Sequence, residues 1–538
     1  NVQLKSSNIR GLLNYQANNA RAESYTDKQV KKYIRKKPAA LQKWMQKHSS
    51  DESGYESALE RQARYLMAKQ AKKKTRVNSI EGIKRLNDYE LRIYTTGYDS
   101  RFEEKLQIPI CPLHYYGDTT KYSYNANKFG FKRGDLSAIR ANKSSPVGAG
   151  AYRFVKYDSG IAYFMANELY YQGCPKITYV QLKDLTKLFK DEDLTGAKLA
   201  EEMKGQTVDV ASLALTQSDL EAIGEINGNG KMSGNEINTC QSANASYAYW
   251  GLNPYRVCIN NEPFSEQSAA LRHAIAMVVS ACRGVQMETE GAKLTSVNAQ
   301  AAKDSWLSPE QPNEDKLCYA ETPDGKEQIY KTDDAVDQKR EEAQQTALKW
   351  LEKAGYTVED GKVTAAPAGA KTLFSMELAG GTDTVGYQLA TAVASDLQGI
   401  GITIQIHTTT VDKLNKKVAN LRRGNVFAKK SSIALWYAEE EMSSNPDLAE
   451  RFAFLENAEL MKAINKSDQT INKEKQKKWT QKAFDEIYAM IVEVPVHQKS
   501  TTMLYSSSRI RSKSMTKNTT MFYSWMREIQ NIDMKAEN

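Results

Sequence analysis

The chain has 538 residues, of which 41% are hydrophobic and 26% are charged. This composition is that of an ordinary folded protein, and it excludes a chain that is mainly disordered. Lys and Arg number 74 while Asp and Glu number 65, so the net charge of +9 permits contact with a polyanion without arguing for one. At about 150 residues per domain, the length predicts three to four domains or one large two-lobed body.

Neither a membrane span nor a disulfide framework is predicted. No apolar run approaches the roughly 18 residues that a span requires. The first residues, Asn-Val-Gln-Leu-Lys, contain no signal sequence and no Cys to acylate, so we expect a cytoplasmic protein or a processed or truncated exported one. The six cysteines lie at least 18 residues apart, which excludes Cys-x-x-Cys spacings. We expect isolated packed thiols, with one or two disulfides as the alternative.

Residues 1 to about 78 predict polar, Lys-rich helices. Leu59, Ala63, Leu66 and Met67 recur at helical spacing between charged residues. Basic clusters lie around residues 31–37 and 72–74. We interpret them as a solvated helix face, because few aromatic residues are interleaved for base stacking. The alternative is a surface that binds nucleic acid or another anionic polymer.

From Val77 onward the pattern changes to short strands and helices. Residues 151–157 and 161–167 predict a hairpin around Asp158-Ser159-Gly160. The further elements expected up to residue 282 are helices over 194–203, 218–226 and 265–282 and strands over 208–211 and 247–253.

The second half of the chain predicts alternating helices and strands. A helix over 339–354 ends at Gly355. A strand over 371–377, a helix over 385–397 and a strand over 402–407 form a strand–helix–strand unit, which favours parallel strands and a right-handed crossover. Helices over 411–423 and 475–492 and strands over 432–437 and 494–496 complete the pattern, so the predicted class is α/β.

The sequence contains one partial metal-binding motif and no catalytic motif. The segment Glu225–Glu236 matches a calcium EF-hand loop at several positions, including the turning Gly230. Its first position is Glu instead of Asp and a strand-like run follows, so we expect a Gly/Asn turn. No His-Glu-x-x-His, Gly-x-Ser-x-Gly or phosphate loop is present, and the five histidines are scattered. We expect no catalytic residue, metal or cofactor; the alternative is a hydrolase whose catalytic groups meet only in the fold.

Aromatic and polar residues gather near three predicted strand ends. Ligand sites often combine aromatic walls with a few directed polar groups at the ends of strands, although core packing explains any single ring equally well. The residues concerned are Tyr247, Tyr249, Trp250 and Asn253 in one segment, Trp436 and Tyr437 ahead of Glu439-Glu440-Glu441 in the second, and Tyr523 and Trp525 in the third.

Eight segments, taken in order, resemble the bacterial extracellular solute-binding proteins of the oligopeptide/dipeptide type, solute-binding family 5. They read SIEGIKRLNDYELRIYTT, PLHYYGD, SPVGAGAYRFVKYDSG, NELYYQGCPKITYVQL, YAYWGLNPYRV, ALKWLEKAGYTVEDGK, ASDLQGIGITIQI and EVPVHQ. The set runs from about residue 77 to the C-terminus. The ending MFYSWMREIQNIDM resembles a clostridial-type peptide-binding branch.

The resemblance implies an α/β, two-lobed periplasmic-binding-protein-like fold of type II with an extra subdomain. On this basis, residues 1–145 form an incomplete helical and mixed subdomain of lobe I, 146–253 the core of lobe I, 254–494 lobe II, and 495–538 a return to lobe I. The lobes would be crossed near Tyr249–Asn253 and Val494–Gln498. The family's first strand is not found, so we expect the N-terminal part of lobe I to be missing or supplied separately.

The resemblance also implies a non-enzymatic receptor outside the cytoplasm. Such a protein captures peptides in a cleft between the lobes and delivers them to the membrane permease subunits of an ABC importer. We expect a monomer that binds no nucleic acid and is lipid-anchored at the outer face of the cell membrane.

The family's Trp-x-Ala-Asp stretch supplies a cleft tryptophan and an acid for the ligand's α-ammonium. Here the stretch reads Trp436-Tyr437-Ala438-Glu439. The family's following Pro-Asp resembles Pro446-Asp447, at a longer spacing. The amine partner is therefore open among Glu439, Glu440, Glu441 and Asp447. The predicted ligand-binding residues are Trp436, Tyr437, Glu439, Asp447, Tyr249, Trp250, Asn253, Tyr523 and Trp525.

Overall fold

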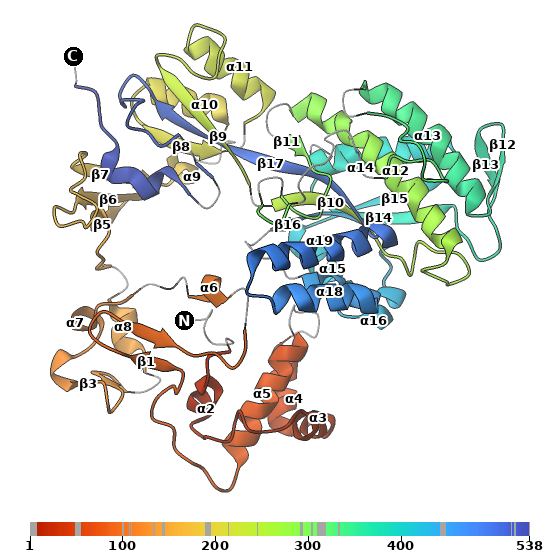
Figure 1. Ribbon diagram of the computed structural model, residues 1–538. Helices are drawn as coiled ribbons and strands as arrows, with labels where there is room; N and C mark the ends of the chain where they lie inside the picture. The colour runs from red at the N-terminus through yellow and green to blue at the C-terminus, as the bar shows by residue number, and fades with distance from the viewer. Residues whose placement is uncertain are drawn as a thin grey trace.

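The computed structural model describes residues 8–48, 55–98, 102–106, 108, 110–132, 135–142, 146–188, 195–213, 215–244, 246–290, 294–302, 305–308, 319–331, 334–382, 384–441, 448–517, 519–520 and 523–536. Helices and strands alternate along the chain, and helices cover the largest sheet on both faces (Figure 1). The class is therefore α/β, as predicted.

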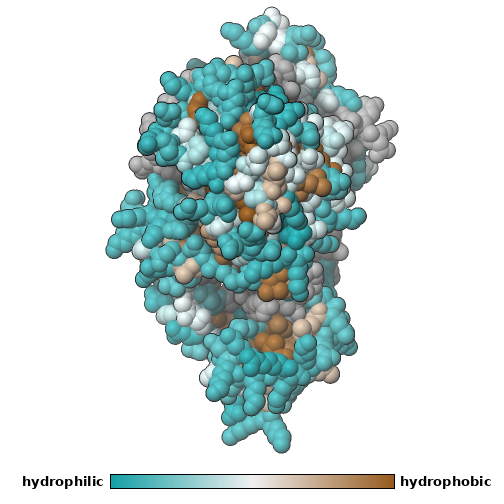
Figure 2. Space-filling view, turned by 90° about the vertical axis from the view of Figure 1, so that its right-hand side faces the viewer, coloured by the Kyte–Doolittle hydropathy of each residue, from teal (hydrophilic) through white to brown (hydrophobic). Residues whose placement is uncertain are grey.

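The N-terminal part of the chain is a group of helices followed by short strands and turns. A capping box between Thr26 and Gln29 starts the second helix described. Leu59 and Ala63 are buried against the preceding helices, which confirms the helical spacing of the sequence. The lower end of the molecule, where these helices lie, is mainly hydrophilic (Figure 2). The elements are α2 (Leu12–Ala17), α3 (Asp27–Arg35), α4 (Ala39–Lys47), α5 (Tyr55–Gln70), β1 (Ile83–Arg85), β2 (Leu91–Ile93), α6 (Phe102–Lys105), α7 (Leu113–Tyr116), η1 (Thr119–Lys121), β3 (Tyr122–Ser123), β4 (Lys128–Phe129) and α8 (Ser137–Ala141).

Beyond residue 146 the chain forms a three-stranded antiparallel sheet with the predicted hairpin. Ser159 (φ 49°) and Gly160 (φ 90°) both adopt positive φ, as a two-residue type I′ turn requires. A second small core follows, in which Met203 and Ile223 pack beside Leu504. The elements are β5 (Tyr152–Asp158), β6 (Ile161–Ala166), β7 (Tyr179–Lys183), α9 (Leu185–Leu188), α10 (Gly196–Lys204), β8 (Val210–Leu213), α11 (Gln217–Ile226) and β9 (Ile237–Ala243).

The centre of the molecule is a sheet with the strand order β11-β17-β10-β16-β14-β15. One core cluster joins it to α12, α13 and α14, and another joins it to α15, α18 and α19, so these two groups of helices cover opposite faces (Figure 1). The strands are β10 (Ser246–Leu252), β11 (Leu294–Ser296), β14 (Leu373–Ala379), β15 (Thr403–Thr409), β16 (Leu435–Glu441) and β17 (Glu493–Ser506). The helices are α12 (Glu266–Glu290), α13 (Val336–Lys353), α14 (Val385–Gly399), α15 (Val411–Arg422), α18 (Ala458–Asp468) and α19 (Lys473–Met490). The remaining elements are β12 (Thr357–Glu359), β13 (Lys362–Ala365), α16 (Asn425–Lys430), α17 (Leu448–Phe452), η3 (Ala453–Leu455) and η4 (Trp525–Asn531).

The predicted strand–helix–strand unit is confirmed as β14, α14 and β15. The two strands are parallel, with Leu373 opposite Thr403. Thr384 caps α14 by accepting a hydrogen bond from the amide of Tyr387. At the far end of the helix, Gly401 (φ 90°) turns the chain into β15.

β17 connects two separately paired regions of the sheet. Its first half pairs with β10 and β11, whereas residues 500–506 pair with β8 and β9. The pairing partner changes at Lys499–Ser500. The short link between β9 and β10 lies beside this point, because the backbone amide of Asn244 donates to the Lys499 carbonyl at 2.9 Å.

The Glu225–Glu236 segment is a turn between α11 and β9, as predicted. The Asn227 side chain donates hydrogen bonds to the carbonyls of Lys231 and Ile237 and accepts one from the Ile237 amide. Its amide is thus used to close the turn. Within the part of the chain that the structure describes, no group of three or more His, Cys, Asp or Glu side chains could hold a metal ion.

The described thiols include four that form no disulfide: Cys174, Cys240, Cys258 and Cys282. These four are isolated thiols, as expected, but of the four only Cys258 and Cys282 are buried, whereas Cys240 is half-buried and Cys174 is exposed. Cys318 lies outside the described residues. Among the helices that the structure describes, none is long and apolar enough to cross a membrane.

Candidate functional site

A cavity of about 480 Å³ opens where β14 and β16 end. From β14 the chain passes through α14 to β15 on one side, and then returns through α15 to β16 on the other side. The carboxyl ends of parallel strands at such a reversal of strand order form a ready-made crevice in α/β folds. The residues that line this β14–β16 cavity are Ala379, Gly380, Thr384, Val385, Gly386, Val411, Leu414, Asn415, Tyr437, Ala438, Glu439 and Lys499.

Two glycines hold the cavity wall in shape. Gly380 has φ 102°, and a Cβ there would lie 2.6 Å from the Thr384 Cγ2 atom. A Cβ on Gly386 would lie 2.6 Å from the Tyr437 Cδ1 atom. Both approaches are too close for any other residue, so the first turn of α14 lies directly against the ring of Tyr437 because Gly386 has no side chain.

Tyr437 is the predicted aromatic residue that reaches the cavity. Its ring is nearly buried, and its hydroxyl lies 3.2 Å from His497 Nε2. Burial, with the nearby charge of Glu439, raises the pKa of the Tyr437 phenol well above its usual value. Burial, with the charges of Lys499 and Arg283, lowers the pKa of His497 to about 3. The contact therefore joins a neutral phenol to a neutral imidazole.

Glu439 and Lys499 form the charged part of the cavity. Because side chains alternate along a strand, Glu439 projects to the same side of β16 as Tyr437. Its carboxylate accepts a hydrogen bond from the Lys499 ammonium, which comes from β17 at the point where the pairing partner of this strand changes. The two side chains are 40% and 36% exposed, so both groups remain open to solvent and to a ligand.

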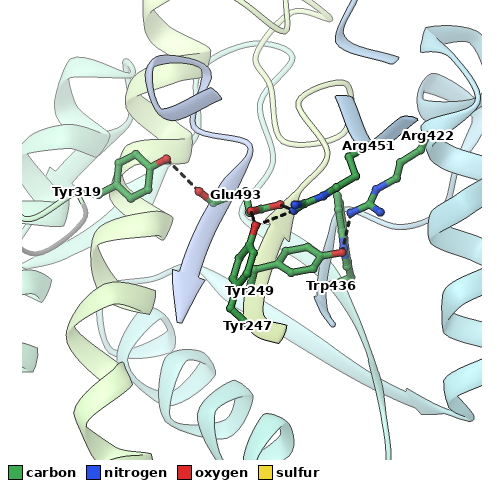
Figure 3. Close-up of polar contacts among 7 residues, drawn as sticks. All are labelled: Tyr247, Tyr249, Tyr319, Arg422, Trp436, Arg451 and Glu493. Carbon is green, nitrogen blue, oxygen red and sulfur yellow. Dashed lines mark hydrogen bonds and ion pairs between the residues drawn. The ribbon is translucent and has the colours of Figure 1, made fainter. Parts of the chain in front are cut away.

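Trp436 faces the opposite side of β16 and lies in the core. Only 2% of it is exposed, and its indole N–H donates to the Tyr249 hydroxyl at 3.1 Å. The same hydroxyl accepts a hydrogen bond from Arg422 at 2.8 Å (Figure 3). A Cβ on Gly251 would lie 2.1 Å from the Trp436 ring, so the indole occupies the space that this glycine leaves.

A buried ion pair lies beside this cluster. Arg451 donates to the Glu493 carboxylate at 2.6 Å, and the Tyr247 hydroxyl donates to the other carboxylate oxygen at 2.6 Å (Figure 3). Arg451 also donates to the Tyr247 hydroxyl, and the Tyr319 hydroxyl donates to the Glu493 carbonyl. The hydroxyls of Tyr247 and Tyr249 thus serve as hydrogen-bond partners for buried polar side chains between the sheet and the helices.

The other predicted ligand residues lie elsewhere. Trp250 is fully buried in the core. Asn253 is fully buried as well, and its side-chain amide donates hydrogen bonds to the carbonyls of Ala428 and Ile433. These two bonds give Asn253 a structural role. Tyr523 and Trp525 line a different cavity of about 540 Å³ with residues of β5–β7. Asp447 and the side chains of Glu440 and Glu441 lie outside the described residues.

The sequence did not single out Lys499, His497 or Gly386. His497 and Lys499 are two positions apart, so their side chains lie on the same face of the strand. The run EVPVHQK indicates this strand only weakly. Their partners are 60 positions away on β16, and no local pattern marks such a pairing.

Comparisons with known proteins agree with this architecture. The chain matches the family described as bacterial extracellular solute-binding proteins, family 5 Middle, over residues 34–446. The search of curated proteins gave no match.

Solved structures resemble the chain at low identity. The oligopeptide-binding protein AppA of Bacillus subtilis, solved with a nonapeptide, is 14% identical, with 85% of this chain and 78% of that chain covered and a TM-score of 0.50. The substrate-binding protein CtaP of Listeria monocytogenes is 13% identical, with 84% and 77% covered and a TM-score of 0.55. NikA of Brucella suis, solved with Fe(III)-EDTA, is 14% identical, with 84% and 78% covered and a TM-score of 0.55. These likenesses show the two-lobed fold, and the family match shows that the chain belongs to the bacterial extracellular solute-binding proteins of family 5.

Proposed function

We propose that the chain is a receptor that captures peptides in the β14–β16 cavity and delivers them to the permease subunits of an ABC importer. The observation that carries this proposal is the position of Glu439, an accessible acid in a cavity at the strand reversal of the sheet. Ligands of α/β folds bind at such positions. Two structural neighbours, AppA of Bacillus subtilis and AppA of Clostridium difficile, are described as an oligopeptide-binding and a putative peptide-binding protein, which supports the same ligand class.

Glu439 is the proposed partner of the peptide's α-ammonium group. The Lys499 ammonium already donates a hydrogen bond to this carboxylate. A peptide amine would replace one cation by another, and the pair would strengthen when closure of the lobes excludes water. Tyr437 would form the apolar wall beside the first peptide residue. We propose no catalytic role for any of these groups.

The finer predictions from the sequence are kept as proposals. They comprise a clostridial-type branch, a monomer, no nucleic-acid partner and a lipid anchor at the outer face of the membrane. Tyr249 and Trp436 would support the cavity from beneath. The lobe crossings predicted near Tyr249–Asn253 and Val494–Gln498 also stay proposals, and the change of pairing partner along β17 favours places a few residues away, at the β9–β10 link and at Lys499–Ser500.

Binding is tested by calorimetry with a library of short peptides. Glu439→Gln should weaken peptides with a free amine by about 10- to 100-fold, since a hydrogen bond to a charged group contributes roughly 1.5–3 kcal/mol. N-acetylated peptides should be affected much less. Glu359→Gln, at an exposed position on β12, is the matched control. Equal losses of affinity for both peptide forms would contradict the role of Glu439 as the amine partner. If no peptide, amino acid, sugar or nickel ion binds, the proposed receptor function is wrong.

Lys499→Met tests the exchange of cations. Without the resident ammonium, free-amine peptides should bind more tightly, and the gain should shrink as salt is added. A loss of affinity for these peptides would show that Lys499 contacts the ligand instead of competing with it.

A further inference from the structure

The positive charge of the protein is concentrated in one small part of the chain. Residues 26–76 contain 15 Lys and Arg against 5 Asp and Glu, a net charge of +10. The whole chain carries +9, so all remaining residues together are close to neutral. A field of one sign is therefore localised on α3, α4, α5 and their links.

The folded arrangement brings two of the basic clusters together. Arg64 on α5 pairs with Asp27 at the start of α3, and the Tyr33 hydroxyl donates to the Gln70 side chain at 3.0 Å. Both contacts join positions 37 residues apart, so α3 and α5 run in the same direction and end side by side. We call the basic residues at this shared end the lysine tip: Arg35, Lys36, Lys37, Lys69, Lys72, Lys73 and Lys74.

The charge of the lysine tip exceeds what the fold itself uses. A helix C-terminus carries roughly half a negative charge, so two helix ends are balanced by about one cation. The tip has seven basic side chains, all of them exposed. Within the described residues, the ion pairs found in the structure include none of the seven. Mutual repulsion among so many cations is relieved when an external anionic surface approaches.

We propose that the lysine tip docks on the anionic phospholipid surface of the membrane. Among the described side chains of residues 8–76, none is at once large, apolar and exposed. Docking is therefore electrostatic, and no side chain inserts into the apolar part of the bilayer. The described side chains of residues 8–76 also include no exposed aromatic ring, so they offer no base-stacking platform of the kind that a single-strand nucleic-acid binder uses. The choice of a membrane over nucleic acid rests on the proposed function, in which the chain works beside a membrane permease.

Vesicle sedimentation of the whole protein tests this proposal. We expect binding to vesicles of phosphatidylglycerol mixed with phosphatidylcholine, none to pure phosphatidylcholine, and loss of binding as salt rises. Each basic residue near such a surface contributes about fivefold in partitioning. The variant K36Q/K37Q/K72Q/K73Q should therefore bind on the order of 10²- to 10³-fold more weakly.

A matched control replaces four exposed lysines elsewhere, as K349Q/K362Q/K416Q/K478Q. It carries the same total charge as the tip variant and should keep most of the binding. Equal binding of the two variants, or no binding of the unmodified protein to anionic vesicles at low salt, would overturn the proposal. Tighter binding to a DNA duplex than to vesicles at equal phosphate, through the same lysines, would reassign the surface to nucleic acid. Peptide titrations of both variants test the receptor function separately, because the tip lies outside the β14–β16 cavity.

Discussion

Replacing Arg451 by Met tests the buried ion pair of the core. The Arg451 and Glu493 side chains are only 3% and 2% exposed, and their N–O distance is 2.6 Å. Methionine keeps much of the apolar volume but removes the cation, which leaves the Glu493 carboxylate buried with a hydrogen bond from Tyr247 alone. Removing one partner of a buried pair costs about 3–5 kcal/mol. We expect the free energy of unfolding to fall by that amount.

Urea unfolding followed by tryptophan fluorescence measures this loss. The control is Lys462→Met, which removes a half-exposed pair with Glu459 at 3.3 Å and should cost about 0–1 kcal/mol. The double variant R451M/E493Q should recover part of the stability, since it leaves no buried charge. If Arg451→Met costs no more than Lys462→Met, the reasoning about a desolvated carboxylate is wrong.

Three further outcomes are expected. Gly251→Ala places a Cβ 2.1 Å from the Trp436 ring, so this variant should be less stable by about 1–3 kcal/mol in thermal unfolding. Gly148→Ala is the control, because its Cβ meets no atom within 4 Å and the stability should hardly change. The pKa of His497 is about 3 in the folded protein against 6.5 in the unfolded chain. The stability that this neutral histidine contributes is therefore complete above pH 6.5, and it falls by about 1.4 kcal/mol per pH unit as the pH decreases toward 3. His497→Gln should reduce this dependence of the free energy of unfolding on pH in urea titrations between pH 7 and 4. Cys282 is fully buried, so a thiol reagent should label it no faster than the protein opens, and rapid labelling of the native protein would contradict its position.

Local patterns predicted most elements because they depend on neighbouring residues. The strand–helix–strand unit around α14 follows from apolar spacing and from the glycines that end each element. β17 was predicted only over 494–496, yet it extends from Glu493 to Ser506. Its later residues are largely Ser and Thr, and they are buried by pairing with β8 and β9, strands more than 250 positions earlier. Such long-range pairing decides strand length and leaves little trace in the local sequence.

The site was harder to predict because composition does not reveal which face a residue occupies. Trp436 and Tyr437 looked equivalent, but strand alternation sends the first into the core and the second to the cavity. Asn253 looked like a ligand amide and instead satisfies two buried carbonyls. The position of Glu439 followed from the resemblance to the family, whereas its contact with Lys499 required the folded sheet.

Three hydrogen bonds hold the link between β9 and β10 against the middle of β17. At this point Asn244 donates its amide N–H to the Lys499 carbonyl, receives a hydrogen bond from Gln498, and receives another from the Thr501 hydroxyl. These three bonds fix the position of β17 against the chain that enters β10. Lys499 takes part in this network through its carbonyl and holds Glu439 through its ammonium. Any shift of the backbone at Lys499 is therefore passed directly to the charged part of the β14–β16 cavity.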